Sequence, residues 1–420
     1  MLGLLDPSSR LPKFWETITE TLMSTRLIQW LLPQLFFCLN LAGVVVYAVT
    51  SGSLGADLNF SSAQIGGLGG AYFIAYAVSQ LLLGSSLGSF SPRLLLGITA
   101  LISAAGAFLL SGAHSYETAM AARLLMGVGF GTAMVGVIYV VGKLYNDRFA
   151  FMVNLSQSLA NAVGAALGSL ASLPLLQNFR LPFAITATLL LVNGILMLIF
   201  ISDREKSTDP SSAAGAQISL GNQLTVILGN GQFWIGTIYF AGLFASFLAY
   251  ADLWNIKFQA DIFGHSSNTA AMINSGVAWG LTIGALVTGI WANKAGFLIP
   301  ARICAWMSLI LMGILYIKPL PGVAIPLMVL LGFFMGAAPL GLAAMNAHIP
   351  EKMQSLASPI LLTVVFLGGG LLMSNVGGSL ASLPSQAFST YQAGLNWFLV
   401  PIAIAAVASL MMKPGRTNSN

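Results

Sequence analysis

The stretch AARLLMGVGFGTAMVG, residues 121–136, decides the fold, because it places one cation and closely spaced glycines inside an apolar run. A charge deep in a lipid-buried helix is costly, so the side chain of Arg123 should face protein or a water-filled cavity. Gly127, Gly129 and Gly131 lack side chains, so we expect another helix backbone to approach closely here.

Two interpretations of Arg123 are open at this point. In the first, the side chain lines a polar pathway through a membrane protein, which the cost of an intramembrane charge favours. In the second, backbone carbonyl groups satisfy the guanidinium, and the residue serves only the packing of the helices.

The composition excludes a water-soluble protein. Hydrophobic residues make up 57% of the chain and charged residues only 7%, whereas soluble domains carry about 25% charged residues. The 17 Lys and Arg and 12 Asp and Glu residues cannot cover a chain of 420 residues. The lipid bilayer is therefore the first expected partner, and the net charge of +5 does not indicate nucleic-acid binding.

Apolar runs and turn residues predict an all-α integral membrane protein. A helix needs about 20 apolar residues to cross the hydrocarbon, and twelve candidates are present: 28–50, 63–84, 93–112, 117–142, 150–173, 182–202, 225–250, 268–291, 300–317, 323–345, 356–379 and 387–411. One long polar segment at the chain's midpoint separates six spans from six. The expected organisation is an N-terminal segment, a six-helix half, a linker, a second half and a tail, over residues 1–25, 26–202, 203–223, 224–412 and 413–420.

The basic residues predict the orientation of the chain. Cytoplasmic loops carry an excess of Lys and Arg. With the N-terminus inside, 13 of the 17 basic residues fall on the cytoplasmic side: Arg10, Lys13, Arg26, Arg93, Lys143, Arg148, Arg204, Lys206, Lys294, Arg302, Lys352, Lys413 and Arg416. We therefore expect both termini and the linker of this multi-pass protein to be cytoplasmic.

The two halves carry an internal repeat. SSAQIGGLGGAYFIAYAVSQLLLG begins at Ser61, and SSNTAAMINSGVAWGLTIGALVTG begins 205 residues later at Ser266. The register aligns Gly84 with Gly289 at the end of the match. Self-similarity at half the chain length is typical of transporters built from two related halves.

An active site is not expected. His114, His265 and His348 lie near predicted loop ends, and Cys38 and Cys304 lie in apolar runs, so the sequence predicts neither a metal site nor a disulfide. The motifs of metalloproteases, hydrolases and phosphate-binding loops are absent. We predict a protein that is not an enzyme and needs no cofactor, and whose transport would use an existing gradient or run downhill rather than use ATP.

At the loops, the chain resembles the major facilitator superfamily. The stretch GSSLGSFSPR, residues 84–93, is similar to that family's loop after the second span, with Gly88 where the family has an acidic residue. The stretch GIWANKAG, residues 289–296, is similar in the second half. The resemblance implies gating loops at Gly84, Arg93, Gly289, Asn293, Lys294 and Gly296. The acidic residue helps to latch the halves in the outward-open state in that family, so Gly88 implies a weaker latch.

The fourth predicted span resembles the family's R-x-x-x-G-x-G motif through Arg123, Gly127 and Gly129. The resemblance implies twelve helices in two pseudo-symmetric six-helix halves, with a cavity between the halves lined by spans one, four, seven and ten. Polar and aromatic residues on these spans and on span two are the candidates for the substrate cavity: Asn40, Tyr47, Tyr72, Tyr76, Gln80, Arg123, Tyr239, Tyr250 and Asn346. A place in the interfacial belt or in helix packing is the alternative for about half of these, because Tyr is enriched at membrane interfaces.

Proton coupling needs an ionisable group within the membrane. The candidates are Asp252, Glu117 and Asp57, each of which has a solvated position at a helix end as its alternative. The passage from Gln64 to Gln80 resembles bacterial metabolite permeases of this superfamily. The resemblance therefore implies a monomeric secondary transporter or facilitator in a bacterial inner membrane, which moves a small organic solute, with or without protons, by alternating access. Export of a drug or siderophore is an alternative, as is a non-transporting membrane sensor or scaffold on the same fold.

Overall fold

The computed structural model describes residues 25–84, 90–145, 148–202, 220–317, 323–382 and 388–415. These residues are almost entirely helical, and no strand occurs among them. In chain order the helices are α2 (Thr25–Leu58), α3 (Ser62–Gly84), α4 (Pro92–Ser111), α5 (Tyr116–Phe130), α6 (Ala133–Leu144), α7 (Phe149–Ser169), η2 (Pro174–Leu176), α8 (Arg180–Phe200), α9 (Leu220–Leu228), α10 (Gly231–Ala249), η4 (Tyr250–Trp254), α11 (Asn255–Phe263), α12 (Ser267–Ala295), α13 (Leu298–Tyr316), α14 (Ala324–Met335), α15 (Leu340–Asn346), α16 (Glu351–Ala381) and α17 (Phe388–Met411).

The predicted all-α membrane architecture is confirmed. Eleven helical segments of the described chain are long and apolar enough to cross a membrane. The predicted fifth span corresponds to α7, which is not among these eleven segments, because its polar Gln157 and Asn161 lower its mean hydropathy. This helix nonetheless packs within the bundle, against α2 and α12.

Three predicted spans are interrupted helices. The fourth consists of α5 and α6, which are separated at Gly131 and Thr132, and the tenth consists of α14 and α15. The seventh was predicted to end at residue 250, but its helical backbone continues through the single π-helical turn η4 into α11. At the other side of the bundle, α9 begins inside the predicted linker 203–223, whose residues 203–219 lie outside the described residues.

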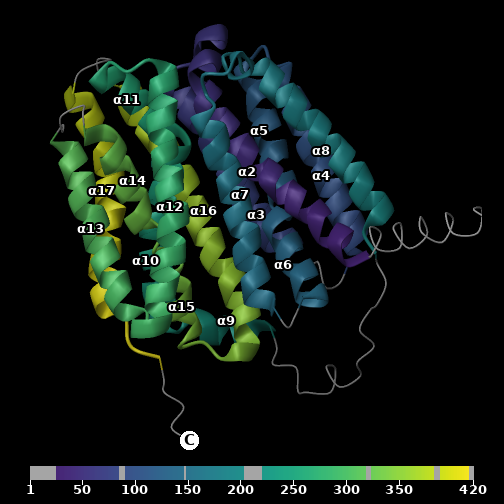
Figure 1. The fold of residues 1–420 in the computed structure, drawn as a ribbon, viewed down its shortest axis with the longest axis vertical. Helices are drawn as coiled ribbons and strands as arrows, with labels where there is room; N and C mark the ends of the chain where they lie inside the picture. Colours follow the sequence, from purple (N-terminus) through teal and green to yellow (C-terminus); the bar gives the residue numbers. More distant parts are fainter. Residues whose placement is uncertain are drawn as a thin grey trace, which may run out of the picture.

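The bundle has two halves, α2–α8 and α9–α17, which lie side by side (Figure 1). Helices α3 and α16 pack together where the halves meet, as do α7 and α12. We call the end at which α8 finishes and α9 begins the linker end. The opposite end, where α2 leads into α3 and α11 leads into α12, is called the far end.

The distribution of apolar side chains is that of a protein surrounded by lipid. One cluster of buried apolar side chains extends through both halves. Many large apolar side chains are also exposed on the outside of the bundle, including those of Leu82, Ile325 and Val400. Water would not support so large an exposed apolar surface, whereas the hydrocarbon of a membrane does.

Glycines on α5 let two neighbouring helices approach, as the sequence predicted. A Cβ atom at Gly127 would overlap the backbone carbonyl oxygen of Tyr72 on α3. At Gly129 it would lie 2.5 Å from the carbonyl oxygen of Thr99 on α4. Because these two glycines face different partners, α5 is held closely between α3 and α4. This close packing keeps Arg123, on the same helix, buried inside the bundle.

We expect Gly127→Ala to destabilise the folded protein by about 1–3 kcal/mol, because overpacking forces helix backbones apart. The measurement is thermal unfolding of purified protein in detergent. Gly313→Ala on α13 is the matched control, because nothing lies within 4 Å of a Cβ built there. Equal unfolding temperatures for the two variants would contradict the close α3–α5 packing.

Candidate functional site

Arg123 lies between two tyrosine rings in the N-terminal half. Its guanidinium carbon is 4.0 Å from the centre of the Tyr47 ring on α2 and 4.3 Å from that of Tyr72 on α3. The residue is 1% exposed. The negative faces of aromatic rings attract a cation most strongly where water is excluded, so the two rings offset part of the cost of burying this charge.

The hydrogen bonds of Arg123 are incomplete. Its Nε donates to the backbone carbonyl oxygen of Leu68 at 3.2 Å. Its Nη1 has no hydrogen-bond partner, and no carboxylate among the described residues forms an ion pair with it. Both interpretations of this residue therefore have support: a carbonyl group and two rings hold it in place, and one edge still offers a free donor.

The two tyrosines are themselves held by hydrogen bonds. The Tyr72 hydroxyl donates to Oδ1 of Asn40 on α2, and the Tyr47 hydroxyl donates to the backbone carbonyl oxygen of Ile65 at 2.6 Å. All of these groups are buried. We call Asn40, Tyr47, Tyr72 and Arg123 the polar cluster. The sequence predicted each of its members as a cavity residue, and the structure brings them together.

Tyr76 and Gln80, the other two predicted residues on α3, lie further towards the linker end. Gln80 is 1% exposed, and neither its amide nitrogen nor its amide oxygen has a hydrogen-bond partner. Buried polar atoms are normally paired, so this amide has the capacity to bind a ligand or water.

Tyr76 contacts aromatic residues that the sequence analysis did not single out. Its ring centre is 4.6 Å from that of Phe366 on α16. Phe366 also stacks on Phe73 at 6.2 Å and meets Phe244 of α10 at 6.4 Å. These four aromatic residues join the halves. Nothing in the sequence distinguishes Phe366 or Phe244 from the other phenylalanines of the apolar helices.

Asp252 is the one predicted acid that lies beside the polar cluster. It is half-buried in the π-helical turn η4, which packs against α2, the helix that carries Asn40 and Tyr47. The other two acids lie elsewhere. Glu117 is exposed in the first turn of α5, and Asp57 forms an ion pair with Arg180 at 3.0 Å.

The hydroxyl groups of Tyr239 and Tyr250, two predicted cavity residues of the C-terminal half, find their hydrogen-bond partners within that half. The buried Tyr239 hydroxyl donates to the backbone carbonyl oxygens of Ala301 and Ala337, at 3.2 and 3.3 Å. The Tyr250 hydroxyl points to the sulfur of Met328 at 3.7 Å. These two tyrosines therefore fit the alternative, a role in helix packing.

Asn346 ends α15 near the linker end, and its buried Oδ1 has no hydrogen-bond partner. Its backbone carbonyl oxygen accepts a hydrogen bond from Nε2 of Gln354 at 2.9 Å. The unpaired Oδ1 leaves Asn346 as a candidate acceptor, apart from the polar cluster.

The predicted gating loops have different surroundings in the two halves. Gly84 ends α3, Arg93 lies in the first turn of α4, and Gly88 is outside the described residues. Gly289 is an open position inside α12, Asn293 and Lys294 lie exposed in its last turn, and Gly296 has a φ of +76°. Helix α3 begins at Ser62 and α12 at Ser267, and 267 − 62 gives the predicted repeat offset of 205.

The halves are closely packed at the far end through α3 and α16. A Cβ at Gly70 would overlap the carbonyl oxygen of Gly370, and one at Gly66 would lie 2.6 Å from that of Met373. The Trp254 indole donates to the same Met373 carbonyl oxygen at 3.0 Å. The helix backbones therefore touch where they cross.

The second far-end contact joins α7 to α12. The Ser169 hydroxyl donates to that of Ser275 at 3.1 Å. Beyond it, Nε2 of Gln177 donates to Oδ1 of Asn268 at 3.0 Å. Together with the α3–α16 crossing, these bonds close the halves against each other at the far end.

The comparison with protein families agrees with this geometry. Residues 34–372, from Gln34 on α2 to Leu372 on α16, match the model of the Major Facilitator Superfamily. The chain belongs to the Major Facilitator Superfamily. No curated protein sequence matches it significantly.

Solved structures of superfamily transporters share the fold. The nucleoside transporter NupG, as a point mutant, has a TM-score of 0.70 and 15% identity over 92% of this chain and 99% of that one. A bacterial homologue of the human lysosomal transporter Spinster, inward-facing and unoccupied, has a TM-score of 0.71 and 14% identity over 93% and 98%. A D-xylose–proton symporter has a TM-score of 0.65 and 17% identity over 93% and 98%.

We expect Arg123→Lys to lower the stability of this superfamily member by on the order of 1 kcal/mol or more. A lysine keeps the charge but loses the planar group that stacks between Tyr47 and Tyr72. Thermal unfolding in detergent gives the measurement. Arg26→Lys, at an exposed position of α2, is the matched control. If both variants unfold at the wild-type temperature, the stacked cation does not hold α2, α3 and α5 together.

Proposed function

We propose that the protein is a secondary transporter that moves a small organic solute across a membrane by alternating access. The observation that carries this proposal is the set of contacts that joins the halves at the far end. Hydrogen bonds and backbone contacts join α3 to α16 and α7 to α12 at the far end. On this proposal the structure is the state closed at the far end, and opening that end requires these contacts to separate.

The similar structures support the proposal at the level of the fold. One of them is an inward-facing, unoccupied transporter. Two others are named for a nucleoside and for D-xylose with a proton. These are small organic solutes, which is the class that we propose for this chain.

Within that mechanism, the polar cluster and Gln80 are the proposed solute-binding groups. Gln80 offers an unpaired donor and an unpaired acceptor, and Arg123 offers an unpaired donor at Nη1. Tyr76 and Phe366 contribute aromatic surface from the two halves. Asp252 is the proposed proton-coupling group, because its segment η4 belongs to the opposite half and packs against α2, which carries Asn40 and Tyr47.

We further propose that the protein works as a monomer in a bacterial inner membrane, with the linker end in the cytoplasm. The distribution of basic residues supports this orientation, since Lys143, Lys294, Arg302 and Lys352 lie near the linker end. The far end would then face outward. The proposed domain boundaries follow the predicted halves, 26–202 and 224–412.

Cysteine labelling tests the orientation. In a background with Cys38 and Cys304 replaced by alanine, we expect an impermeant maleimide added to intact cells to label His114→Cys and to spare Ala295→Cys. Both positions are exposed, His114 at the far end and Ala295 at the linker end. Labelling after the membrane is permeabilised is the control for reactivity. The reverse pattern in intact cells would overturn the orientation.

Uptake into proteoliposomes tests transport itself. The screen uses radiolabelled nucleosides, sugars and organic acids, with and without an imposed pH gradient. We expect uptake of at least one compound by the wild type, and stimulation by the gradient that Asp252→Asn removes. Folded protein that moves none of the panel would favour the sensor or scaffold alternative.

A reversible cross-link tests alternating access. In the cysteine-free background, Ser169→Cys with Ser275→Cys places two thiols where the hydroxyl oxygens are 3.1 Å apart, so a disulfide can form. We expect oxidation to abolish uptake and reduction to restore it, because the far end can no longer open. Each single-cysteine variant is the control. Undiminished uptake by the oxidised double variant would refute the proposed opening between α7 and α12.

A further inference from the structure

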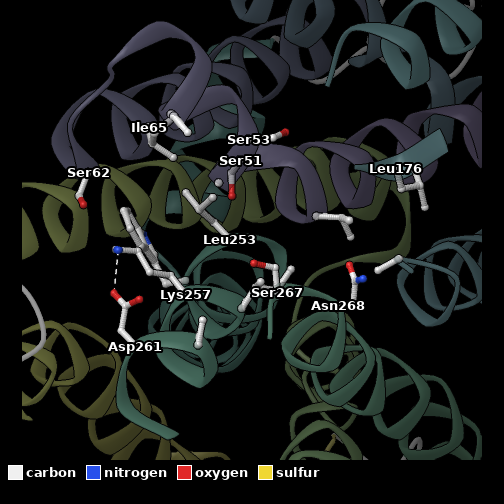
Figure 2. Close-up of a pocket in the computed structure, with 18 of the residues that line it drawn as sticks. Ser51, Ser53, Ser62, Ile65, Leu176, Leu253, Lys257, Asp261, Ser267 and Asn268 are labelled. Atoms are coloured by element: carbon white, nitrogen blue, oxygen red, sulfur yellow. Dashed lines mark hydrogen bonds and ion pairs between the residues drawn. The ribbon is translucent and has the colours of Figure 1, made fainter. Parts of the chain in front are cut away.

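A cavity of about 520 Å³ lies at the far end, outside the polar cluster. It is bounded by the end of α2, the start of α3, the η4–α11 segment and the start of α12 (Figure 2). Its size falls within the range of pockets that hold small molecules. We call it the outer cavity. Its chemistry is set by Ser62, Trp254, Lys257, Asp261, Ser267 and Asn268.

Lys257 and Asp261 supply the charges of the outer cavity. They are one turn apart on α11, and Nζ of the lysine is 2.7 Å from Oδ2 of the aspartate. Asp261 has a second donor, because the Tyr391 hydroxyl on α17 also donates to its Oδ2. The aspartate therefore keeps a partner if the lysine leaves, whereas the lysine has three donors and one carboxylate partner.

Further hydrogen-bond donors face the cavity from the two repeat-related helices. Ser62 and Ser267 are the first residues of α3 and α12, and neither hydroxyl bonds to another described residue. Asn268 accepts a bond from Gln177 through Oδ1, so its amide hydrogens are directed elsewhere. The N-terminal ends of both helices add partial positive charge. The cavity thus offers one cation and several hydroxyl and amide groups.

A cation is a poor fit for this site. Its one carboxylate is already bound by an ammonium group and a phenol. An anion, in contrast, would exchange one carboxylate for another at Lys257 and would leave Asp261 bonded to Tyr391. Trp254 supplies apolar surface beside the same space.

We propose that the outer cavity binds a small hydroxylated organic acid of the sugar-acid kind. Its carboxylate pairs with Lys257 in place of Asp261. Its hydroxyl groups bond to Ser62, Ser267 and Asn268. This binding site is separate from the polar cluster and does not depend on transport, so it stands or falls independently of the proposed function.

Calorimetric titration of the full-length protein in detergent tests the site. The probe is D-gluconate, and D-glucitol is its neutral counterpart of equal chain length. We expect gluconate to bind at least about tenfold more tightly than glucitol, since a hydrogen bond to a charged group contributes about 1.5–3 kcal/mol. Gluconate affinity should fall about tenfold or more in Lys257→Gln for the same reason.

Asp261→Asn gives the opposite expectation. The asparagine still accepts from Tyr391 but no longer competes for Lys257, so gluconate should bind several-fold more tightly. Lys352→Gln, at an exposed position of α16 near the linker end, should leave the affinity unchanged. The Lys257–Asp261 pair is partly exposed, and ion pairs that reach solvent contribute little to stability. We therefore expect all three variants to unfold near the wild-type temperature, which the same samples can verify.

Three results would overturn the proposal. One is equal affinity for gluconate and glucitol, or no gluconate binding by folded wild type. Another is an unchanged affinity in a folded Lys257→Gln variant. The third is weaker binding in Asp261→Asn, which would mean that the ion pair builds the cavity rather than competes with its ligand.

Discussion

The contact between the backbones of α3 and α16 is the constraint on which the rest of the structure depends. Gly70 and Gly370 leave no room for even a methyl group between these helices. In lipid, helices associate through close packing rather than through the exclusion of water. The crossing therefore sets how near the two halves come, and with it the distances between the aromatic residues that join them.

The polar groups of the two halves are used differently. In the N-terminal half, a cation with no carboxylate partner among the described residues is kept in the bundle by two tyrosine rings, and each ring is fixed by its own hydroxyl. In the C-terminal half, Tyr239 and Tyr250 bond to atoms of their own half. The repeat thus preserves helix positions but not the hydrogen-bonding partners of the polar side chains.

Much of the fold could be predicted from the sequence, because lipid imposes a length and a polarity on every span. The starts of α3 and α12 agree with the repeat read from Ser61 and Ser266 to within one residue. Side-chain partners were harder to predict. Arg123 and Tyr72 stood out because polar groups are rare in apolar helices, whereas Phe366 did not. Asp57 resembled Asp252 as a helix-end acid, and only the fold shows that Arg180 pairs with it.

The π-helical turn at Tyr250–Trp254 gives the seventh span a built-in register change. The hydrogen bond of such a turn spans one residue more than that of an α-helix, i to i+5 instead of i to i+4. If that residue were drawn into regular α-helix, the segment beyond it would rotate by about 100° about its axis. Leu253 and Trp254 contact the glycines of α3, and Lys257 follows them on α11. A change of register by one residue would therefore move Leu253 and Trp254 away from the α3–α16 crossing and turn the Lys257–Asp261 pair away from the outer cavity in the same movement.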